Sequence, residues 1–182
     1  MKILAKWTIK EYHQMIEAGI LDDRQVELLA GEIIEMSPEK PIHYNKTRRG
    51  VSYLEQLFKN LAEIRFNGPI TLADSEPEPD IAIVKLPVSQ YDFHHPYAED
   101  IFWVIEVANK SLKKDLELKQ TIYANAGIQE YWIMDLSQTK LIVFREPNDG
   151  YYQSQEEYTE GEISSLAFPN IQISVTKLLG LN

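Results

Sequence analysis

The chain has 182 residues, 44% of them hydrophobic, which is enough to bury one ordinary core, so we expect a single domain over residues 1–182. It has no cysteine, which excludes disulfides, thiolate zinc sites and cysteine nucleophiles and leaves carboxylates, histidines, lysines and hydroxyls for any chemistry. Its 18 Lys and Arg against 28 Asp and Glu give 18 − 28 = −10, the wrong sign for a protein that coats nucleic acid nonspecifically.

The first thirty residues alternate charged and apolar positions, and no later stretch is apolar over the roughly 18 residues that a membrane span requires. We therefore expect a soluble cytoplasmic protein.

A helix followed by a hairpin is predicted at the start of the chain. Thr8 and Glu11 have the spacing of a capping box, which predicts a short helix after Thr8. Residues 25–36 resemble two short strands around a turn at Ala30 and Gly31.

A long amphipathic helix is predicted from about residue 43 to residue 62, because apolar side chains recur there at helical spacing. This stripe consists of Val51, Leu54, Leu57, Phe58 and Leu61. Basic residues cluster near the helix start, at Lys40, Lys46, Arg48 and Arg49. The cluster is either a local basic patch or a solvated helix face.

The remaining elements alternate strands with a crossover helix, which favours an α/β fold with a mixed sheet flanked by helices and additional β-hairpins. Strands are predicted near residues 64–72, 80–85, 101–108 and 130–135, a helix over 112–126 that ends at Gly127, a hairpin from 139–145 and 151–158, and a short helix over 174–179. The longest irregular stretch is expected at 86–100.

One carboxylate is predicted in a buried strand. Residues 101–108 are apolar on both faces except at Glu106, as in a central strand covered on both sides. A buried anion is costly unless it is paired or holds a cation. A salt bridge to a buried Lys or Arg is the simpler explanation of Glu106.

Asp80 begins the preceding strand, directly after Pro79. If the two strands are neighbours, Asp80 and Glu106 converge. An ordinary aspartate at a strand end is the alternative.

The helix predicted over 112–126 directs two charged residues toward the sheet. At about 100° per residue, Asp115 and Lys119 fall within its apolar face. Their i, i+4 spacing also allows a structural ion pair.

A lysine directed at Glu106, with Asp80 nearby, fits hydrolysis of a phosphodiester with Mg²⁺ or Mn²⁺. Carboxylate oxygens hold such ions, and the ion polarises the phosphoryl group and lowers the pKa of a bound water. Lys119 would offset the charge that grows in the transition state.

These residues resemble the Uma-type family of restriction endonucleases in the PD-(D/E)XK nuclease superfamily, over most of the chain. The resemblance rests on residues 26–34, Met36-Ser37-Pro38, His43, Pro79-Asp80, Glu106-Val107, Asp115, Lys119, Tyr123 and the most specific run, 126–135.

The resemblance implies a restriction-endonuclease-like fold and an endonuclease that acts on DNA with Mg²⁺ or Mn²⁺. Asp80 and Glu106 would be metal ligands, and Lys119 the catalytic lysine, moved from the strand to the following helix. Glu27 is similar to an additional acidic catalytic residue of the family, and His43 to the histidine that opens its long helix. The family's Ser-Pro-Ser type loop is replaced here by residues 108–111, which bears on the choice of substrate.

Two other features favour structural interpretations. His94 and His95 are neighbours on a loop without the spacing of a zinc site. The aromatic residues Tyr131, Trp132, Tyr151 and Tyr152 are typical of core and cross-strand packing rather than of base stacking.

Three functions therefore compete. The leading hypothesis is a Mg²⁺-dependent endonuclease, possible as a homodimer because enzymes that cut duplexes frequently act in pairs. The second is a catalytically inactive nuclease-fold protein that binds or regulates a partner. The third uses Asp80 and Glu106 as an acid and base pair on a small molecule or sugar, which an inward lysine fits poorly.

Overall fold

A computed structural model describes residues 4–108 and 115–181 of the chain. In this part, the fold is built on a six-stranded mixed sheet with the strand order β3-β4-β5-β6-β7-β8. The strands are β3 (Glu63–Phe66), β4 (Ile81–Val84), β5 (Ile101–Ala108), β6 (Glu130–Asp135), β7 (Lys140–Asn148) and β8 (Tyr151–Tyr158).

Helices and two small hairpin-like sheets complete the fold. The longer helices are α1 (Ile9–Glu17) and α2 (Pro41–Leu57), and the shorter helical elements are η1 (Val88–Tyr91), η2 (Ala98–Asp100), the π-helix η3 (Asp115–Lys119), α4 (Gln120–Asn125) and α5 (Val175–Leu178). The small sheets pair β1 (Val26–Leu29) with β2 (Glu32–Glu35), and β9 (Glu162–Ile163) with β10 (Ile173–Ser174).

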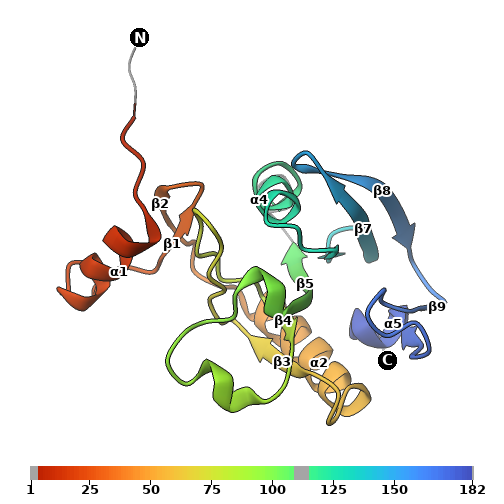
Figure 1. Cartoon of the computed structure of the whole chain (residues 1–182). Helices are drawn as coiled ribbons and strands as arrows, with labels where there is room; N and C mark the ends of the chain where they lie inside the picture. Colours follow the sequence, from red (N-terminus) through yellow and green to blue (C-terminus); the bar gives the residue numbers. More distant parts are fainter. Residues whose placement is uncertain (1–3, 109–114, 182) are drawn as a thin grey trace.

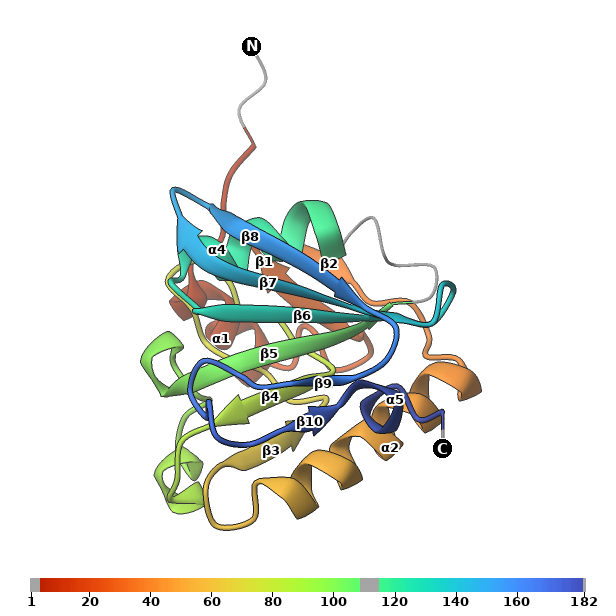
Figure 2. The ribbon, with the colours of Figure 1, turned by 90° about the vertical axis from the view of Figure 1, so that its right-hand side faces the viewer.

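The large sheet separates two apolar layers. On one face, α2, α5 and the β9–β10 pair cover a core that includes Leu54, Trp103 and Trp132. On the other face, α4 packs over a core that includes Tyr123 and Tyr131, and the β1–β2 hairpin lies on the same side (Figure 2). Figure 1 shows α1 beside this hairpin. The α/β class and the mixed sheet flanked by helices, as predicted, are therefore confirmed.

β5 is a central strand of the sheet, and its side chains point into both apolar layers. It pairs antiparallel with β4 and parallel with β6. A parallel pair requires a crossover between its strands, and η3 and α4 belong to the crossover between β5 and β6. Side chains alternate along β5, so Trp103 and Ile105 face the α2 layer while Val104 and Glu106 face the α4 layer.

Local sequence signals are confirmed where they depend on nearby residues. Thr8 and Glu11 form both hydrogen bonds of the capping box at the start of α1. The β1–β2 turn has Ala30 and Gly31 at φ 47° and 75°, a conformation that glycine adopts without strain. The predicted hairpin is confirmed as β7–β8, with its turn at Asp149 and Gly150, but β7 runs on to Asn148, beyond the predicted end at residue 145.

Some predicted boundaries are wrong. The long helix ends at Leu57, so Leu61 lies beyond it with 47% of its surface exposed and is not part of the buried stripe. The strand predicted over 64–72 stops at Phe66, and an irregular segment leads on to β4. The β9–β10 pair was not predicted. The helix predicted over 112–126 begins outside the described residues and consists, where described, of a π-turn followed by α4.

No helix within residues 4–108 and 115–181 has both the length and the apolar character needed to cross a membrane.

Substitution of the leucines at positions 54 and 61 tests how α2 packs on the sheet. Leu54 is fully buried, so Leu54→Ala is expected to lower the free energy of unfolding by about 2–5 kcal/mol. Leu61→Ala, the matched control, should change it by less than about 0.5 kcal/mol. Urea denaturation of both variants measures the difference, and equal losses would contradict the packing of α2 described here.

Candidate functional site

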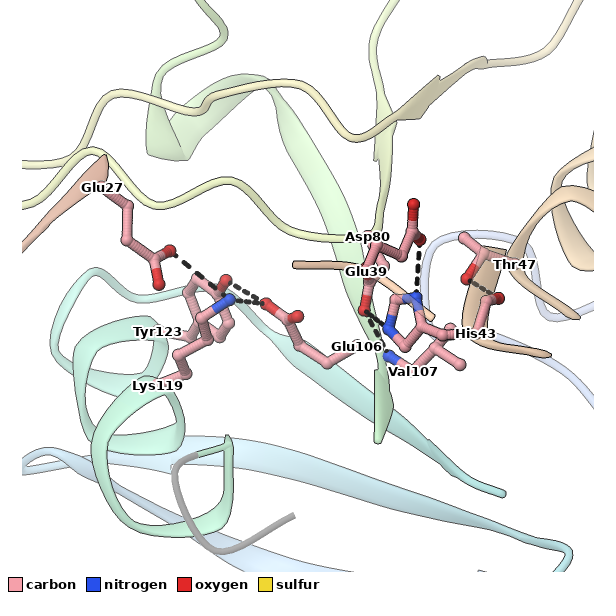
Figure 3. Close-up of polar contacts among 9 residues, drawn as sticks. All are labelled: Glu27, Glu39, His43, Thr47, Asp80, Glu106, Val107, Lys119 and Tyr123. Atoms are coloured by element: carbon pink, nitrogen blue, oxygen red, sulfur yellow. Dashed lines mark hydrogen bonds and ion pairs between the residues drawn. The ribbon is translucent and has the colours of Figure 1, made fainter. Parts of the chain in front are cut away.

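A buried carboxylate on β5 lies at the centre of the site. Glu106 is only 3% exposed and points into the α4 layer. Its Oε1 accepts hydrogen bonds from Lys119 Nζ at 2.8 Å and from the Tyr123 hydroxyl at 2.7 Å (Figure 3). The carboxylate is therefore held in place by two donors that come from the crossover between β5 and β6.

Lys119 joins two buried carboxylates. Its Nζ lies 2.8 Å from Glu106 Oε1 and 3.6 Å from Glu27 Oε2, and all three side chains are at most 6% exposed. Taking such charges out of water costs several kcal/mol for each ion, and removing one partner leaves the others uncompensated. Glu27 comes from the β1–β2 hairpin, so three segments far apart in the sequence meet at this ion pair.

The local backbone explains how Lys119 reaches the sheet. Lys119 is the last residue of the π-helix η3, and α4 follows without a break. Tyr123 comes four residues later, so both side chains lie on the face that packs against the sheet. A π-turn shifts the register of a helix by one residue, and such turns are frequent at functional sites.

Asp80 lies opposite Glu106, immediately before β4. Ile81 pairs with Ile105, so one further step of the same antiparallel register places position 80 across from position 106. Side chains of residues that face each other in this way project to the same side, with Cβ atoms about 5 Å apart. Asp80 Oδ2 accepts a hydrogen bond from the backbone N–H of Val107 at 2.6 Å.

His43 contacts the same aspartate from the first turn of α2. Its Nε2 lies 3.3 Å from Asp80 Oδ2, and its Nδ1 lies 2.7 Å from Glu39 Oε1. Thr47 donates its hydroxyl hydrogen bond to the His43 carbonyl, one helical turn away. Figure 3 shows His43 between the two carboxylates.

The two carboxylates decide the charge of His43. Partial burial alone would lower the pKa of its imidazole, but the hydrogen bonds and negative charges of Asp80 and then of Glu39 outweigh burial and raise the pKa to about 9. The ring is therefore a cation at neutral pH in the metal-free protein.

Burial and negative charge also shift the pKa values of other groups at the site. Burial, followed by the charge of Glu27, raises the pKa of Glu78, whereas Lys119 lowers it. Burial and the charge of Glu106 raise the pKa of the Tyr123 hydroxyl well above its usual range. Tyr123 therefore acts only as a hydrogen-bond donor to Glu106 at physiological pH.

The donors around Asp80 fit a hard divalent cation. Among the described residues, ligand atoms of Glu39, His43 and Asp80 lie within 4.8 Å of one another. Carboxylate oxygens suit Mg²⁺ and Mn²⁺, and Mn²⁺ also accepts imidazole. With no cysteine in the chain, a thiolate-bound metal is excluded. This group, with two carboxylates and one imidazole, therefore fits a divalent ion, but it shares only Asp80 with the ligand pair of Asp80 and Glu106 that the sequence predicts.

The structure brings three of the four predicted site residues into contact, namely Glu27, Glu106 and Lys119. The fourth, Asp80, lies across from Glu106 in the strand register, but its carboxylate contacts the Val107 N–H and His43 instead. The inward direction of Lys119 and its approach to Glu106 are confirmed as geometry, while the catalytic and metal-binding roles of Asp80, Glu106, Lys119 and Glu27 stay predictions. The side chain of Asp115 and the loop at 109–111 lie outside the description. Glu39 and the role of Tyr123 were not predicted, although the i, i+4 spacing of Lys119 and Tyr123 was a usable signal.

The histidine pair at positions 94 and 95 lies away from this site. His94 stacks on Tyr97 with ring centroids 4.8 Å apart, and its Nδ1 hydrogen bonds to the His95 carbonyl. Both histidines line a cleft of about 820 Å³ beside α1, together with His13 and the buried Glu76. The metal-ligand group found among the described residues does not include them.

The aromatic residues that were expected to be structural lie mostly in the core. Tyr131 and Trp132 are fully buried, and Tyr152 is nearly so, with its hydroxyl bound to the Ile128 carbonyl. Tyr151 is the exception and is 66% exposed.

Comparisons with known proteins identify the family and the fold. The family model described as "Uma2: Putative restriction endonuclease" matches residues 9–176. A solved structure described as a "putative nuclease belonging to DUF820 from Anabaena variabilis ATCC 29413" is similar with a TM-score of 0.71 and 19% identity, over 87% of this chain and 91% of that chain. At this identity the likeness shows a shared fold. No curated protein matches the chain.

The pKa of His43 provides a test of the contact with Asp80. In EDTA, an NMR titration of the His43 ring should give a midpoint near pH 9. Because the folded pKa is raised above the ordinary histidine value of 6.5, the stabilisation is fully present below about pH 6.5 and is lost as the pH rises through about 9. Denaturation of the wild type should show this loss, and His43→Gln should not.

Glu39→Gln serves as the control for this titration. It removes one of the two negative partners and should lower the midpoint without abolishing the shift. A wild-type midpoint near 6.5 would contradict the ion pair of His43 and Asp80.

Proposed function

The chain belongs to the Uma2 family, and from this premise we propose that it is a divalent-metal-dependent endonuclease that hydrolyses phosphodiester bonds in DNA. The observation that carries the proposal is the convergence of Lys119, Glu106 and Glu27 in a buried cluster, with Asp80 across from Glu106. Mg²⁺ or Mn²⁺ as the ion, a homodimer and a cytoplasmic location belong to the same proposal.

The carboxylates of Asp80 and Glu106 would hold the metal ion. When bound, the ion polarises the phosphoryl group and lowers the pKa of a water molecule, which supplies the nucleophile at neutral pH. The Val107 N–H fixes one oxygen of Asp80, and the Tyr123 hydroxyl fixes one oxygen of Glu106. Both ligands are therefore oriented before any ion arrives, which reduces the entropy lost on binding.

Lys119 supplies a fixed positive charge. An ammonium group with 6% side-chain exposure acts in a medium of low polarity, where it stabilises a developing negative charge more strongly than in water. We place the transferring phosphoryl group beside its Nζ. Glu27 acts through Lys119, because its carboxylate orients the ammonium from the side opposite Glu106.

A catalytically inactive nuclease-fold protein is the second candidate. The observation that favours it is that Lys119 and Tyr123 already occupy Glu106 Oε1, as in a purely structural ion pair. The net charge of −10 also disfavours a large nucleic-acid interface. A cleavage assay distinguishes the two candidates.

Nicking of supercoiled plasmid tests the nuclease directly. The wild type is expected to nick in Mg²⁺ or Mn²⁺ and to stop in EDTA. Lys119→Gln should slow nicking by roughly 100-fold or more, the loss typical of one electrostatic group in a transition state. Asp80→Asn should have an effect of similar size, because an amide is a weaker ligand than a carboxylate.

Matched controls separate chemistry from folding. Lys59→Gln and Asp92→Asn change the same residue types at exposed positions and should nick like the wild type. Lys119→Gln leaves buried carboxylates without their partner and should lower the free energy of unfolding by about 3–5 kcal/mol. If this variant does not fold, Asp80→Asn is the variant that tests the assignment. Nicking by both site variants at the wild-type rate would refute the assignment, and the absence of nicking by the wild type favours the second candidate.

The tyrosine at position 123 is expected to position Glu106. Tyr123→Phe removes a buried hydrogen bond to a charged group, which should lower the free energy of unfolding by about 1–3 kcal/mol. It should also slow nicking by about 10- to 100-fold, as losses of groups that orient metal ligands do.

Tyr152→Phe is the matched control, since Tyr152 is also buried and donates to the Ile128 carbonyl rather than to a carboxylate of the site. It should be destabilised by about 1 kcal/mol and nick normally. Equal nicking by the two variants at equal stability would exclude a positioning role for Tyr123.

A further inference from the structure

Most of α2, together with the residue before it, differs in charge from the rest of the chain. Residues 40–54 contain four Lys and Arg and no Asp or Glu. The remaining residues carry 18 − 4 = 14 basic groups against 28 acidic ones, a balance of 14 − 28 = −14. A polyanion that approaches this protein is therefore attracted to α2 and repelled elsewhere.

The basic residues of this stretch have different roles. Lys46 Nζ donates to the carbonyls of Leu179 and Gly180, at 3.2 and 2.7 Å, and so fixes the end of α5. Among the described residues, neither Arg48 nor Arg49 forms an ion pair. Their charges are left to interact with solvent or with a ligand. The exposed Lys40 and Arg49 fit a solvated helix face, whereas Arg48 is half-buried and lies over an aromatic ring.

An aromatic surface lies beside Arg48. Tyr44 is 45% exposed and packs edge-on against Phe66 of β3, with ring centroids 5.7 Å apart. The Arg48 guanidinium lies 5.2 Å from the Phe66 ring centroid, one helical turn after Tyr44. We call Tyr44, Arg48 and Phe66 the α2–β3 platform.

The platform adjoins the candidate catalytic site through the backbone. Tyr44 directly follows His43, whose ring contacts Asp80. Phe66 pairs with Ile81, the residue directly after Asp80. The platform and the candidate catalytic site are therefore joined by adjacent residues of α2 and by the β3–β4 pairing.

We propose that the α2–β3 platform binds an unpaired nucleobase of the cleaved DNA strand, with Arg48 on an adjoining phosphate. Aromatic side chains beside basic groups are the arrangement by which proteins bind single strands, because every base has a face that can stack. A base inside an intact duplex is already stacked on its neighbours. The inference rests on the proposed nuclease function and narrows its substrate to DNA with single-stranded character.

Binding of fluorescently labelled oligodeoxynucleotides, measured by fluorescence anisotropy in EDTA, tests the proposal without cleavage. Three probes of about 12 nucleotides are used: a single strand, its duplex and the same strand with abasic positions. The full chain should bind the single strand at least about tenfold more tightly than the other two, because a stacked base contributes roughly 1–3 kcal/mol.

Variants locate the binding. Tyr44→Leu should weaken single-strand binding about tenfold, while Tyr44→Phe keeps the ring and should bind like the wild type. Arg48→Gln should reduce the slope of log affinity against log salt by about 1. Tyr151→Leu and Arg24→Gln are the controls, because both positions are exposed and distant in sequence from α2, and both should bind normally.

The outcomes separate this inference from the nuclease proposal. Equal binding by Tyr44→Leu and the wild type, equal binding of intact and abasic strands, or no binding by the wild type each overturns the platform. If single-strand binding depends on Tyr44 but the protein nicks no plasmid, the platform proposal is supported and the nuclease proposal is rejected. If nicking depends on Lys119 but not on Tyr44, and Tyr44→Leu binds single strands with unchanged affinity, the nuclease proposal is supported and the platform proposal is rejected.

Discussion

The buried ion pair between Lys119 and Glu106 is the interaction on which the arrangement of the site depends. Both charges are taken out of water, and only the short contact between them, with Glu27 and Tyr123 as further partners, offsets that cost. A nonpolar pair of the same size would fill this space at no electrostatic cost. The retention of charge in the core is therefore better explained by chemistry than by stability, which is why a nuclease is favoured over an inert scaffold.

The topology of the sheet makes this pair possible. The parallel pairing of β5 with β6 requires a crossover, and the crossover carries Lys119 and Tyr123 back over the sheet. The antiparallel pairing of β5 with β4 places Asp80 across from Glu106. β5 thus carries Glu106, which pairs with the Lys119 ammonium, and lies next to β4, which follows Asp80. α2 contributes His43, which contacts Asp80.

Much of this could be predicted from the sequence because it depends on short periodicities. The apolar run around Glu106 marks a central strand, and the helical period directs Lys119 inward, so both burial predictions are confirmed. The family resemblance added Glu27, which no local pattern identifies. The contact of His43 with Asp80 could not be predicted, since the two residues are distant in sequence and their approach depends on how α2 docks on the sheet. The exposure of Leu61 shows the same limit, because helical periodicity continues past the residue at which the helix ends.

Two sets of ligands compete for the ion in this geometry, since Asp80 lies across from Glu106 in the strand register while its carboxylate contacts the imidazole of His43. A crystal structure of the protein with Mn²⁺, with the ion located by its anomalous scattering, decides between them. We predict one peak bound by oxygens of both Asp80 and Glu106 at about 2.0–2.3 Å, with Lys119 beside it. A peak held by Glu39, His43 and Asp80 without Glu106, or no peak at a saturating Mn²⁺ concentration, would contradict the central claim.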